Sequence, residues 1–339
     1  MPNITSNANY QQILSMALED RSSGYQDLVS NNNALLAVMK RKGLWETYSG
    51  PKIRQTLQIG KQVAQWYSGY DQLLNPAIDL FNDAYFDPKM VVVPVILSMQ
   101  EILNNEGQNQ LMDVFVTYIK AAEKALEDAM DAGIYSDGTA NGGKQITGLA
   151  TAIPIVNTSG IYGGIDRSTA TIWQTKTFDA NSVLAGTTQV SSTSIRPLLN
   201  YVMTKQSRGR DYADLLIMSP EHYAAYDAAT VAIQRQTNET SLGALGFSAL
   251  EYIGGGKRAE IVLDGGIGSN MPANTTFGIN TDTLRMRYHP NRNFDKLFDG
   301  DGMMPIDKDA IAQFIGFMGE LTMVNPMFNW RLYDSNPAA

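Results

Sequence analysis

Hydrophobic positions near the N-terminus follow helical spacing in two short stripes. The stripes are Ile13, Leu14, Ala17 and Leu18, followed by Leu35, Val38 and Met39. Neither stripe is long enough to form a stable helix by itself in water. Residues 1–42 are therefore predicted to be a partly helical arm that docks on its own chain or on another subunit.

The next segment has the alternation of a β-strand. Apolar and polar residues alternate over 53–59, Gly60–Lys61 fits a two-residue turn, and residues 63–70 are rich in strand-favouring types, including Trp66 and Tyr67. The pattern predicts a long two-stranded β-ribbon with its tip at Gly60–Lys61. A ribbon alone is marginal in water, so we expect it to lie against another surface. An ordinary hairpin within one sheet is the alternative.

A continuous apolar run and a long helical pattern come next. The run from Met90 to Met99 contains several β-branched residues and predicts a buried strand. Apolar positions from Leu111 to Ala129 keep helical spacing, and Gly133 stands where a C-cap is expected. A helix of around 25 residues would be roughly 37 Å long, which makes it a candidate axis for the domain.

The remaining chain mixes loops, helices and strands. Residues 137–193 are rich in Gly, Ser, Thr and Asn and predict loops and short strands. The elements predicted after them are a helix over 195–206, a strand over 214–218, a helix from Ser219–Pro220 to Ile233, a hairpin within 250–263, and strands over 275–279 and 284–288. The apolar stretch 310–333 is predicted to return to the core formed by the strand at Met90.

Composition narrows the classes of function. With 44% hydrophobic and 18% charged residues, the chain can bury enough apolar surface to fold. The absence of cysteine excludes disulfides, thiolate metal sites and a cysteine nucleophile. The polar start lacks the pattern of a secretory signal and the longest apolar run is too short to span a membrane, so we expect a cytoplasmic site of synthesis. A net charge of −8 disfavours wrapping around nucleic acid.

The charge is distributed unevenly along the chain. Residues 1–70 contain seven Lys and Arg but four Asp and Glu, whereas the rest of the chain is strongly acidic. A basic arm on an acidic body would suit an arm that lies across a neighbouring copy of the same protein. Chance clustering is the alternative, because charge patterning alone is weak evidence.

The sequence lacks residues that the common catalytic and ligand-binding motifs require. His222 and His289 are the chain's two histidines, and neither has an acidic or cysteine partner at ligand spacing, so we interpret both as capping or surface residues. The loop 265–268 lacks the helix N-terminus and the Lys–Ser/Thr pair of a phosphate site. The acidic loop 299–302 lacks the glutamate of a calcium site. We therefore predict no enzymatic activity, no cofactor and no metal; an unrecognised hydrolase or nucleotide-binding enzyme is the alternative.

Taken in order, these parts resemble the major capsid proteins of tailed bacteriophages with the Hong Kong 97-type fold. The shared order is helical arm, β-ribbon, strand, long helix, Gly-rich crossover, mixed lobe and closing strand. The sequence itself is most similar over 135–149 and over 160–167 followed by Trp173. The resemblance spans nearly the whole chain, and the order of the parts is more specific than any single motif.

The resemblance implies an α+β fold with a spine helix, a peripheral P-domain, an axial A-domain and an extended E-loop. The implied divisions are an N-terminal arm over 1–42, the E-loop over 43–87, the P-domain over 88–147, the A-domain over 148–305 and a C-terminal strand over 306–339 that returns to the P-domain. Some relatives cross-link neighbours through a lysine and an asparagine. Lys52 and Lys61 have no partner recognisable by motif, so that chemistry is not carried over.

The resemblance also implies a function. Such a chain assembles into hexamers and pentamers of an icosahedral shell around double-stranded DNA, in the virion after assembly in the host cytoplasm. Its partners are further copies of itself, a portal and a separate scaffolding protein, and decoration proteins are left open. The residues expected at contacts between subunits are Lys52, Arg54, Gly60, Lys61, Trp66 and Tyr67. An encapsulin-like compartment shell on the same fold is the alternative.

Overall fold

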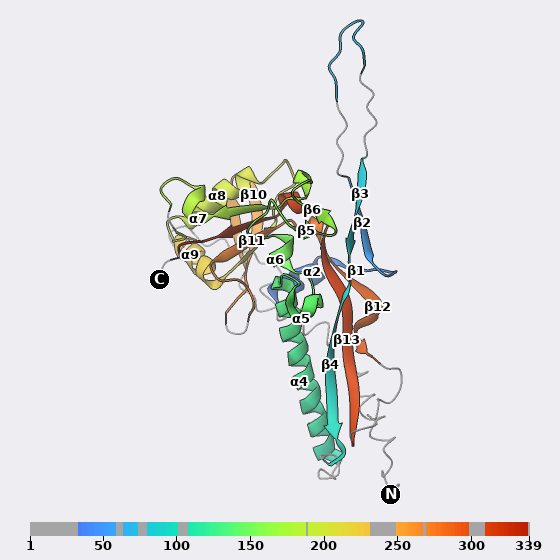
Figure 1. Cartoon of the computed structure of the whole chain (residues 1–339). Helices are drawn as coiled ribbons and strands as arrows, with labels where there is room; N and C mark the ends of the chain where they lie inside the picture. The colour runs from blue at the N-terminus through green and yellow to red at the C-terminus, as the bar shows by residue number, and fades with distance from the viewer. Residues whose placement is uncertain are drawn as a thin grey trace.

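The computed structural model describes most of the chain. The residues described are 33–58, 64–73, 80–100, 108–187, 189–230, 249–266, 269–297 and 309–337, without the side chains of Ala34, 108–116 and Ala249. A long helix and two long strands form an extended leg, a lobe of sheet and short helices lies beside one end of it, and a loop projects beyond the other elements (Figure 1). The polypeptide runs between leg and lobe more than once, so the two parts are interleaved in sequence.

A four-stranded sheet forms the leg. Its order is β1 (Trp45–Thr47), β12 (Leu284–Lys296), β13 (Ala310–Met323) and β4 (Lys89–Ser98). β13 runs antiparallel to β4 along the whole length of β4, from Ala310 opposite Ser98 to Gly319 opposite Lys89. This pairing confirms the strand predicted at Met90 and the return of the C-terminal stretch to it. The prediction that this strand is buried is wrong for one face, because Met90, Val92 and Ile96 are exposed. The β-branched residues of β4 favour the extended backbone that the ladder requires.

The spine helix α4 (Gln108–Tyr135) packs against β4 and has 28 residues, which corresponds to about 42 Å. Its buried residues follow one another at helical spacing: Ile119, Ala122, Leu126, Met130 and Ile134. The predicted C-cap at Gly133 is wrong, because the helix continues to Tyr135 and Gly133 does not take a positive φ. Gly133 instead gives room to Ile146, whose Cβ lies 3.4 Å from the position that a Cβ on Gly133 would occupy.

A six-stranded sheet forms the lobe. Its order is β7 (Lys176–Asp179), β14 (Trp330–Tyr333), β11 (Thr275–Ile279), β8 (Leu215–Met218), β10 (Lys257–Leu263) and β9 (Ala249–Gly254). The central strand β8 is buried on both faces. Leu215 and Ile217 belong to the core shared with α4, whereas Leu216 and Met218 belong to the core under the helices α8 (Ile195–Lys205) and α9 (Pro220–Thr230). A run of four apolar residues is what a strand with two buried faces requires.

The C-terminal stretch does not return to a single sheet. β13 joins the leg, but β14 lies between β7 and β11 in the lobe, so the expectation that all of 310–333 returns to the strand at Met90 is wrong for β14. The short helix η4 (Pro326–Phe328) separates the two strands, and the Asn325 side chain caps it. Gly278 of β11 makes room for Trp330, since a Cβ there would lie 2.0 Å from the indole ring.

The remaining elements outside the ribbon are short. They are α2 (Ala34–Arg41), α5 (Ala140–Gly143), α6 (Leu149–Ala152), β5 (Ile161–Tyr162), β6 (Ile165–Asp166), η1 (Thr171–Trp173), α7 (Ala180–Val183) and η3 (Thr281–Thr283). The Asn33 side chain caps α2 by accepting a hydrogen bond from the Leu36 amide, and its own amide donates to Asp131 of α4. The helical piece predicted around Leu35, Val38 and Met39 is thus confirmed, and it docks on its own chain.

The closest backbone approach at the end of α4 is at Gly148. A Cβ on this residue would lie 2.1 Å from the Ile134 carbonyl oxygen, so we expect Gly148→Ala to destabilise the chain by at least about 2 kcal/mol. Gly133→Ala is the matched control, because the Cβ there meets ordinary contacts and alanine favours a helix by up to about 1 kcal/mol. Urea unfolding of both variants measures the difference; equal midpoints would contradict this account of the junction.

Candidate functional site

The projecting ribbon contains the first strand that the sequence predicted but a different second strand. β2 (Ile53–Gln58) pairs antiparallel with β3 (Phe81–Phe86), from Ile53 opposite Phe86 to Gln58 opposite Phe81. The predicted second strand over 63–70 is wrong, because the described part of it, 64–70, has no strand. The missed signal is the alternation in 81–86, which places Ala84 and Phe86 on the buried face with Ile53 and Leu57.

The turn of this ribbon is also displaced from Gly60–Lys61, two residues that lie outside the described part of the chain. The pairing of β2 with β3 is symmetrical about Gly69–Tyr70. At that point the Asp71 amide donates to the Ser68 carbonyl at 3.2 Å, and the Ser68 amide donates to the Asp71 carboxylate at 2.9 Å. Gly69 has a φ of +52°, a conformation that glycine adopts without cost. We call residues 64–73 the loop tip.

The loop tip carries large apolar side chains in full contact with solvent. Trp66 is 98% exposed, Tyr67 68% and Leu73 63%, and Tyr70 is fully exposed. Trp66 and Tyr67 are among the contact residues predicted from the sequence, whereas Tyr70 and Leu73 were not predicted because the turn was expected at Gly60–Lys61. Exposed apolar groups of this kind mark interaction sites, and Trp and Tyr are the types that most often anchor protein interfaces.

The base of the ribbon is fixed to the body of the molecule. The Tyr85 amide donates to the Gly163 carbonyl at 2.9 Å, and the rings of Phe86 and Tyr162 meet edge to face at 5.1 Å. On the other strand, the Arg287 guanidinium donates to the Gln55 side-chain oxygen at 2.7 Å. The direction of the ribbon is therefore set by the body, and the loop tip points away from α4 and from both sheets (Figure 1).

Two of the three basic residues predicted in the ribbon are paired within it, and the third, Lys61, lies outside the described residues. Lys52 forms an ion pair with Asp87 at 2.9 Å, and Arg54 forms one with Asp83 at 2.7 Å. Hydrogen bonds from Arg54 and then from Thr56 lower the pKa of Asp83 below its ordinary value. Both pairs lie on the exposed base of the ribbon, so the structure does not bring Lys52 and Arg54 together with Trp66 and Tyr67.

Other basic residues of the N-terminal fifth also find partners in the same chain. The Arg41 guanidinium donates to both carboxylate oxygens of Glu260 in β10, at 3.1 and 2.5 Å. Lys42 pairs with Asp214 and donates to the Thr281 hydroxyl at 2.9 Å. The basic residues of the N-terminal fifth thus pair in part with acidic residues of the same chain. The two explanations offered from the sequence, an arm that lies across a neighbouring copy and chance clustering, did not include such pairing.

Two carboxyl groups are buried where leg and lobe meet. Glu320 of β13 is 1% exposed; one carboxyl oxygen accepts from the Thr147 amide at 2.6 Å, and the other has no hydrogen-bond partner among the described residues. Burial raises the pKa of Glu320 to about 8. Asp264 follows β10 and accepts a hydrogen bond from the Tyr135 hydroxyl at the end of α4. Burial raises the pKa of Asp264 to about 6.

The two histidines lie in different parts of the molecule, His222 in α9 of the lobe and His289 in β12 of the leg. The sequence indicated that His222 is a capping or surface residue, and this prediction is wrong. Its ring is buried inside the lobe, with Nδ1 2.8 Å from the Thr276 hydroxyl. Burial lowers the pKa of His222 to about 4. His289 lies beside the Tyr48 ring, with ring centres 5.9 Å apart.

Other candidate chemistry is limited in the part of the chain that the structure describes. Within the described ranges, no group of three or more His, Asp or Glu side chains could hold a metal ion. The acidic loop 299–302 lies outside the described residues. Among the described helices, α4 included, none combines the length and the hydropathy needed to cross a bilayer.

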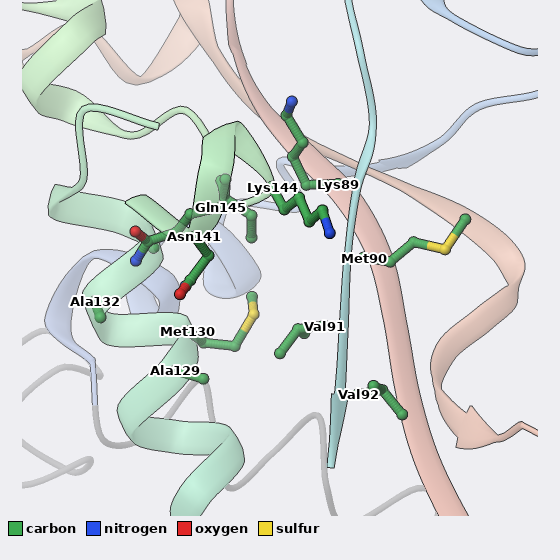
Figure 2. A pocket seen from close by; sticks show the side chains of 12 residues that line it. Lys89, Met90, Val91, Val92, Ala129, Met130, Ala132, Asn141, Lys144 and Gln145 are labelled. Carbon is green, nitrogen blue, oxygen red and sulfur yellow. The ribbon is translucent and has the colours of Figure 1, made fainter. Parts of the chain in front are cut away.

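A groove of about 340 Å³ lies between α4, β4 and the segment 141–146. Figure 2 shows Val91 and Met130 pointing toward one another across it, whereas Met90 and Val92 point to the other side of the strand. The Lys89 ammonium donates to the Gly143 carbonyl at 2.7 Å, and Lys144 has no carboxylate partner among the described residues. The groove therefore has an apolar floor and a cationic rim with no acidic lining residue. We call it the α4–β4 groove.

Similarity to known proteins is found in the structure and not in the sequence. No family model and no curated protein matches this sequence. Among solved structures, a chain of the cyanophage A-1(L) capsid asymmetric unit superposes with a TM-score of 0.62 at 15% identity, covering 87% of this chain and 92% of that one. The chain has the Hong Kong 97-type fold of tailed-phage capsid proteins.

Two further structures agree with this fold. The capsid protein of a native GTA particle has a TM-score of 0.51 at 10% identity, covering 86% of this chain and 89% of its own. That of Myoviridae phage XM1 has a TM-score of 0.50 at 13% identity, covering 87% and 91%. These neighbours are structural capsid proteins, in agreement with the expected fold class. At such low identity they establish the fold of this chain.

The buried carboxyl of Glu320 predicts a pH dependence of stability. Its pKa in the folded state, about 8, lies above the ordinary value of 4.5. As the pH rises, the unfolded chain therefore loses this proton at a lower pH than the folded chain does. The contribution of this carboxyl to the free energy of unfolding is fully present below about pH 4.5 and is lost as the pH rises through 8. Glu320→Gln keeps an acceptor for the Thr147 amide but cannot ionise.

We expect Glu320→Gln to be more stable than the natural chain at pH 8.5, by a few kcal/mol in order of magnitude, and similar to it near pH 5. Urea unfolding at both pH values measures the difference. Glu46→Gln, a change at a half-exposed carboxylate, is the control for a general charge effect. A constant difference between Glu320→Gln and the natural chain at the two pH values would contradict the buried-carboxyl account.

Proposed function

We propose that this chain is the major capsid protein of a tailed bacteriophage and assembles into an icosahedral shell around double-stranded DNA. The observation that carries the proposal is the loop tip: a chain with a capsid fold holds Trp66, Tyr67 and Tyr70 in solvent at the end of a ribbon whose base is anchored to its own body. Such a surface is costly for an isolated molecule and is stabilised when another copy covers it.

This proposal assigns a role to each part of the chain. The leg, with α4 and the four-stranded sheet, would be the P-domain; the six-stranded lobe would be the A-domain at the centre of hexamers and pentamers; and the ribbon would be the E-loop. Each contact between copies can be moderate, because a closed symmetrical lattice sums many of them. On this view the ribbon contributes contact area and the two sheets supply rigidity.

The acidic character of the chain supports enclosing DNA rather than binding it. A shell with a net charge of −8 per copy repels a polyphosphate overall, which leaves the genome free to be packed without tight binding to the wall. A portal and a separate scaffolding protein would be the other partners in the host cytoplasm, with the shell ending in the virion. The same fold could also serve an encapsulin-like compartment, whose particles would contain protein cargo instead of DNA.

The role of the loop tip is tested by replacing its aromatic side chains. We expect the triple variant Trp66→Ser, Tyr67→Ser, Tyr70→Ser to remain a soluble, folded subunit, because these side chains are exposed and bury nothing within the chain. It should form shells at less than about one tenth of the natural yield, since aromatic anchors contribute a large share of interface energy. Negative-stain microscopy and light scattering of the purified chains measure the yield.

The triple replacement by Phe is the matched control, because it keeps aromatic area while removing the polar atoms. Normal shells from the Ser variant would refute the proposed role of the loop tip. If the natural chain expressed alone or with its neighbouring genes gave no particles under any condition, the capsid function itself would be wrong. Particles filled with protein and lacking nuclease-protected DNA after phage growth would favour the compartment alternative.

A further inference from the structure

A cluster of basic residues lies at one end of the lobe. Three segments meet there: the C-terminal end of α8, the turn over 206–212, and the turn between β9 and β10 (Figure 1). Residues 204–212 and 250–258 together contain five cationic and two acidic side chains, whereas the whole chain has a net charge of −8. The five cationic residues, which we call the lobe cations, are Lys205, Arg208, Arg210, Lys257 and Arg258.

The backbone that carries the lobe cations is held by contacts among the three segments. The Arg208 amide donates to the Asp211 carbonyl at 2.9 Å, and the Asp211 amide donates back at 3.0 Å, which closes a tight turn. The Lys257 ammonium donates to the Gly209 carbonyl in that turn. A Cβ on Gly255 would lie 2.8 Å from a hydroxyl of α8, so the β9–β10 turn packs closely on the end of this helix. The cluster is therefore arranged before any ligand binds.

The two lysines of the cluster are oriented by neutral groups. Lys205 donates to the Tyr201 hydroxyl at 2.9 Å, and its ammonium lies 5.0 Å from the centre of the same ring. The Lys257 ammonium lies 4.8 Å from the centre of the Tyr212 ring. A carbonyl, a hydroxyl or an aromatic ring attracts an ammonium group without cancelling its charge. Both lysines therefore remain available to an anion.

The arginines of the cluster are also largely free of carboxylates. Arg208 and Arg210 are exposed, and neither has an ion pair among the described residues. Arg258 lies 3.6 Å from Glu251, the one described carboxylate that pairs with a lobe cation. Basic residues of the N-terminal fifth, by contrast, pair with carboxylates of the same chain at shorter distances. The lobe cations thus keep their charge, which favours an external anionic ligand.

The chemistry of the cluster fits a ligand with closely repeated negative charges. Duplex DNA carries one phosphate charge per about 1.7 Å of its axis, so cations from separate segments can each contact a phosphate. Arg208 and Arg210 present planar guanidinium groups, and the forked donors of arginine match phosphate oxygens. Four exposed or half-exposed cations without a carboxylate partner give several such contacts at once.

We propose that the lobe cations bind the phosphate backbone of double-stranded DNA, and that this end of the lobe faces the interior of the shell. This inference rests on the proposed shell function and names the part of the wall that touches the genome. Phosphate contacts carry no sequence information, so the binding is independent of DNA sequence. The acidic remainder of the chain keeps each contact weak and confines it to this end of the lobe.

Binding of the purified full-length chain to a short fluorescent DNA duplex tests the lobe cations directly. Fluorescence anisotropy between about 50 and 200 mM NaCl should give a binding constant that falls with salt, with a logarithmic slope of about −3. In the triple variant Lys205→Gln, Arg208→Gln, Arg210→Gln, we expect at least about tenfold weaker binding at the lower salt and a slope near −1. These three side chains are exposed, so the variant is expected to fold.

The matched control removes the same number of charges elsewhere. Lys124→Gln, Lys144→Gln and Lys176→Gln change three exposed lysines outside the cluster. This variant should bind within about threefold of the natural chain and with the same slope, because charges far from the contact are screened by salt. Equal affinity and slope for the natural chain and the lobe variant would overturn the proposal, and so would the absence of binding by the natural chain at the lower salt.

Hydrogen exchange in particles distinguishes DNA from a neighbouring copy as the ligand. Backbone amides of 206–212 should exchange at least about threefold more slowly in DNA-filled particles than in particles without DNA. The same rate in both kinds of particle, whether slow because another copy covers the cluster or fast because nothing does, would overturn the proposal. Failure of the natural chain to form particles counts against the shell function instead, and the anisotropy test still decides whether the lobe cations bind DNA.

Discussion

The pairing of β4 with β13 is the interaction on which the rest of the molecule depends. It joins residues 89–98 to residues 310–319 along a complete antiparallel ladder. The inner face of this pair gives α4 an apolar surface to pack against. Without that surface the 28-residue helix would lose the tertiary packing that stabilises it. The C-terminal part of β13 then carries Glu320 to the end of α4, where leg and lobe share one core.

The two sheets are held together by strands whose residues face two cores. In β8 alternate side chains contribute to the core beside α4 and to the core under α8 and α9. The chain crosses between sheets again after β13, where Asn325 and η4 turn it into β14. Because neither sheet is made from one continuous segment, leg and lobe are expected to fold and unfold together. The same frame fixes the base of the ribbon and so determines where the loop tip points.

The ribbon shows where local sequence preference misleads. Gly60–Lys61 has suitable turn chemistry, and residues 63–70 have strand-favouring side chains, so a short hairpin is the natural local prediction. The actual partner of β2 is β3, because Ala84 and Phe86 can be buried against Gly163 and Tyr162 while residues 64–70 have nothing on the body to pack against. Trp66 and Tyr67 could be picked out from their types alone, but Tyr70, Asp71 and the groove could not, since each depends on where distant segments meet.

The sequence by itself determined the order and type of most elements: the strand at Met90, the long helix, the helix–strand–helix segment over 195–230 and the hairpin within 250–263. These follow from periodicity and turn chemistry, which act over a few neighbouring residues. Tertiary structure alone decided which strands pair, that β14 leaves β13 for the other sheet, that His222 and Glu320 are buried, and that Arg41 and Lys42 bind their own lobe. Pairing and burial depend on contacts between residues far apart in the chain, and the free energy of those contacts is not encoded in any single segment.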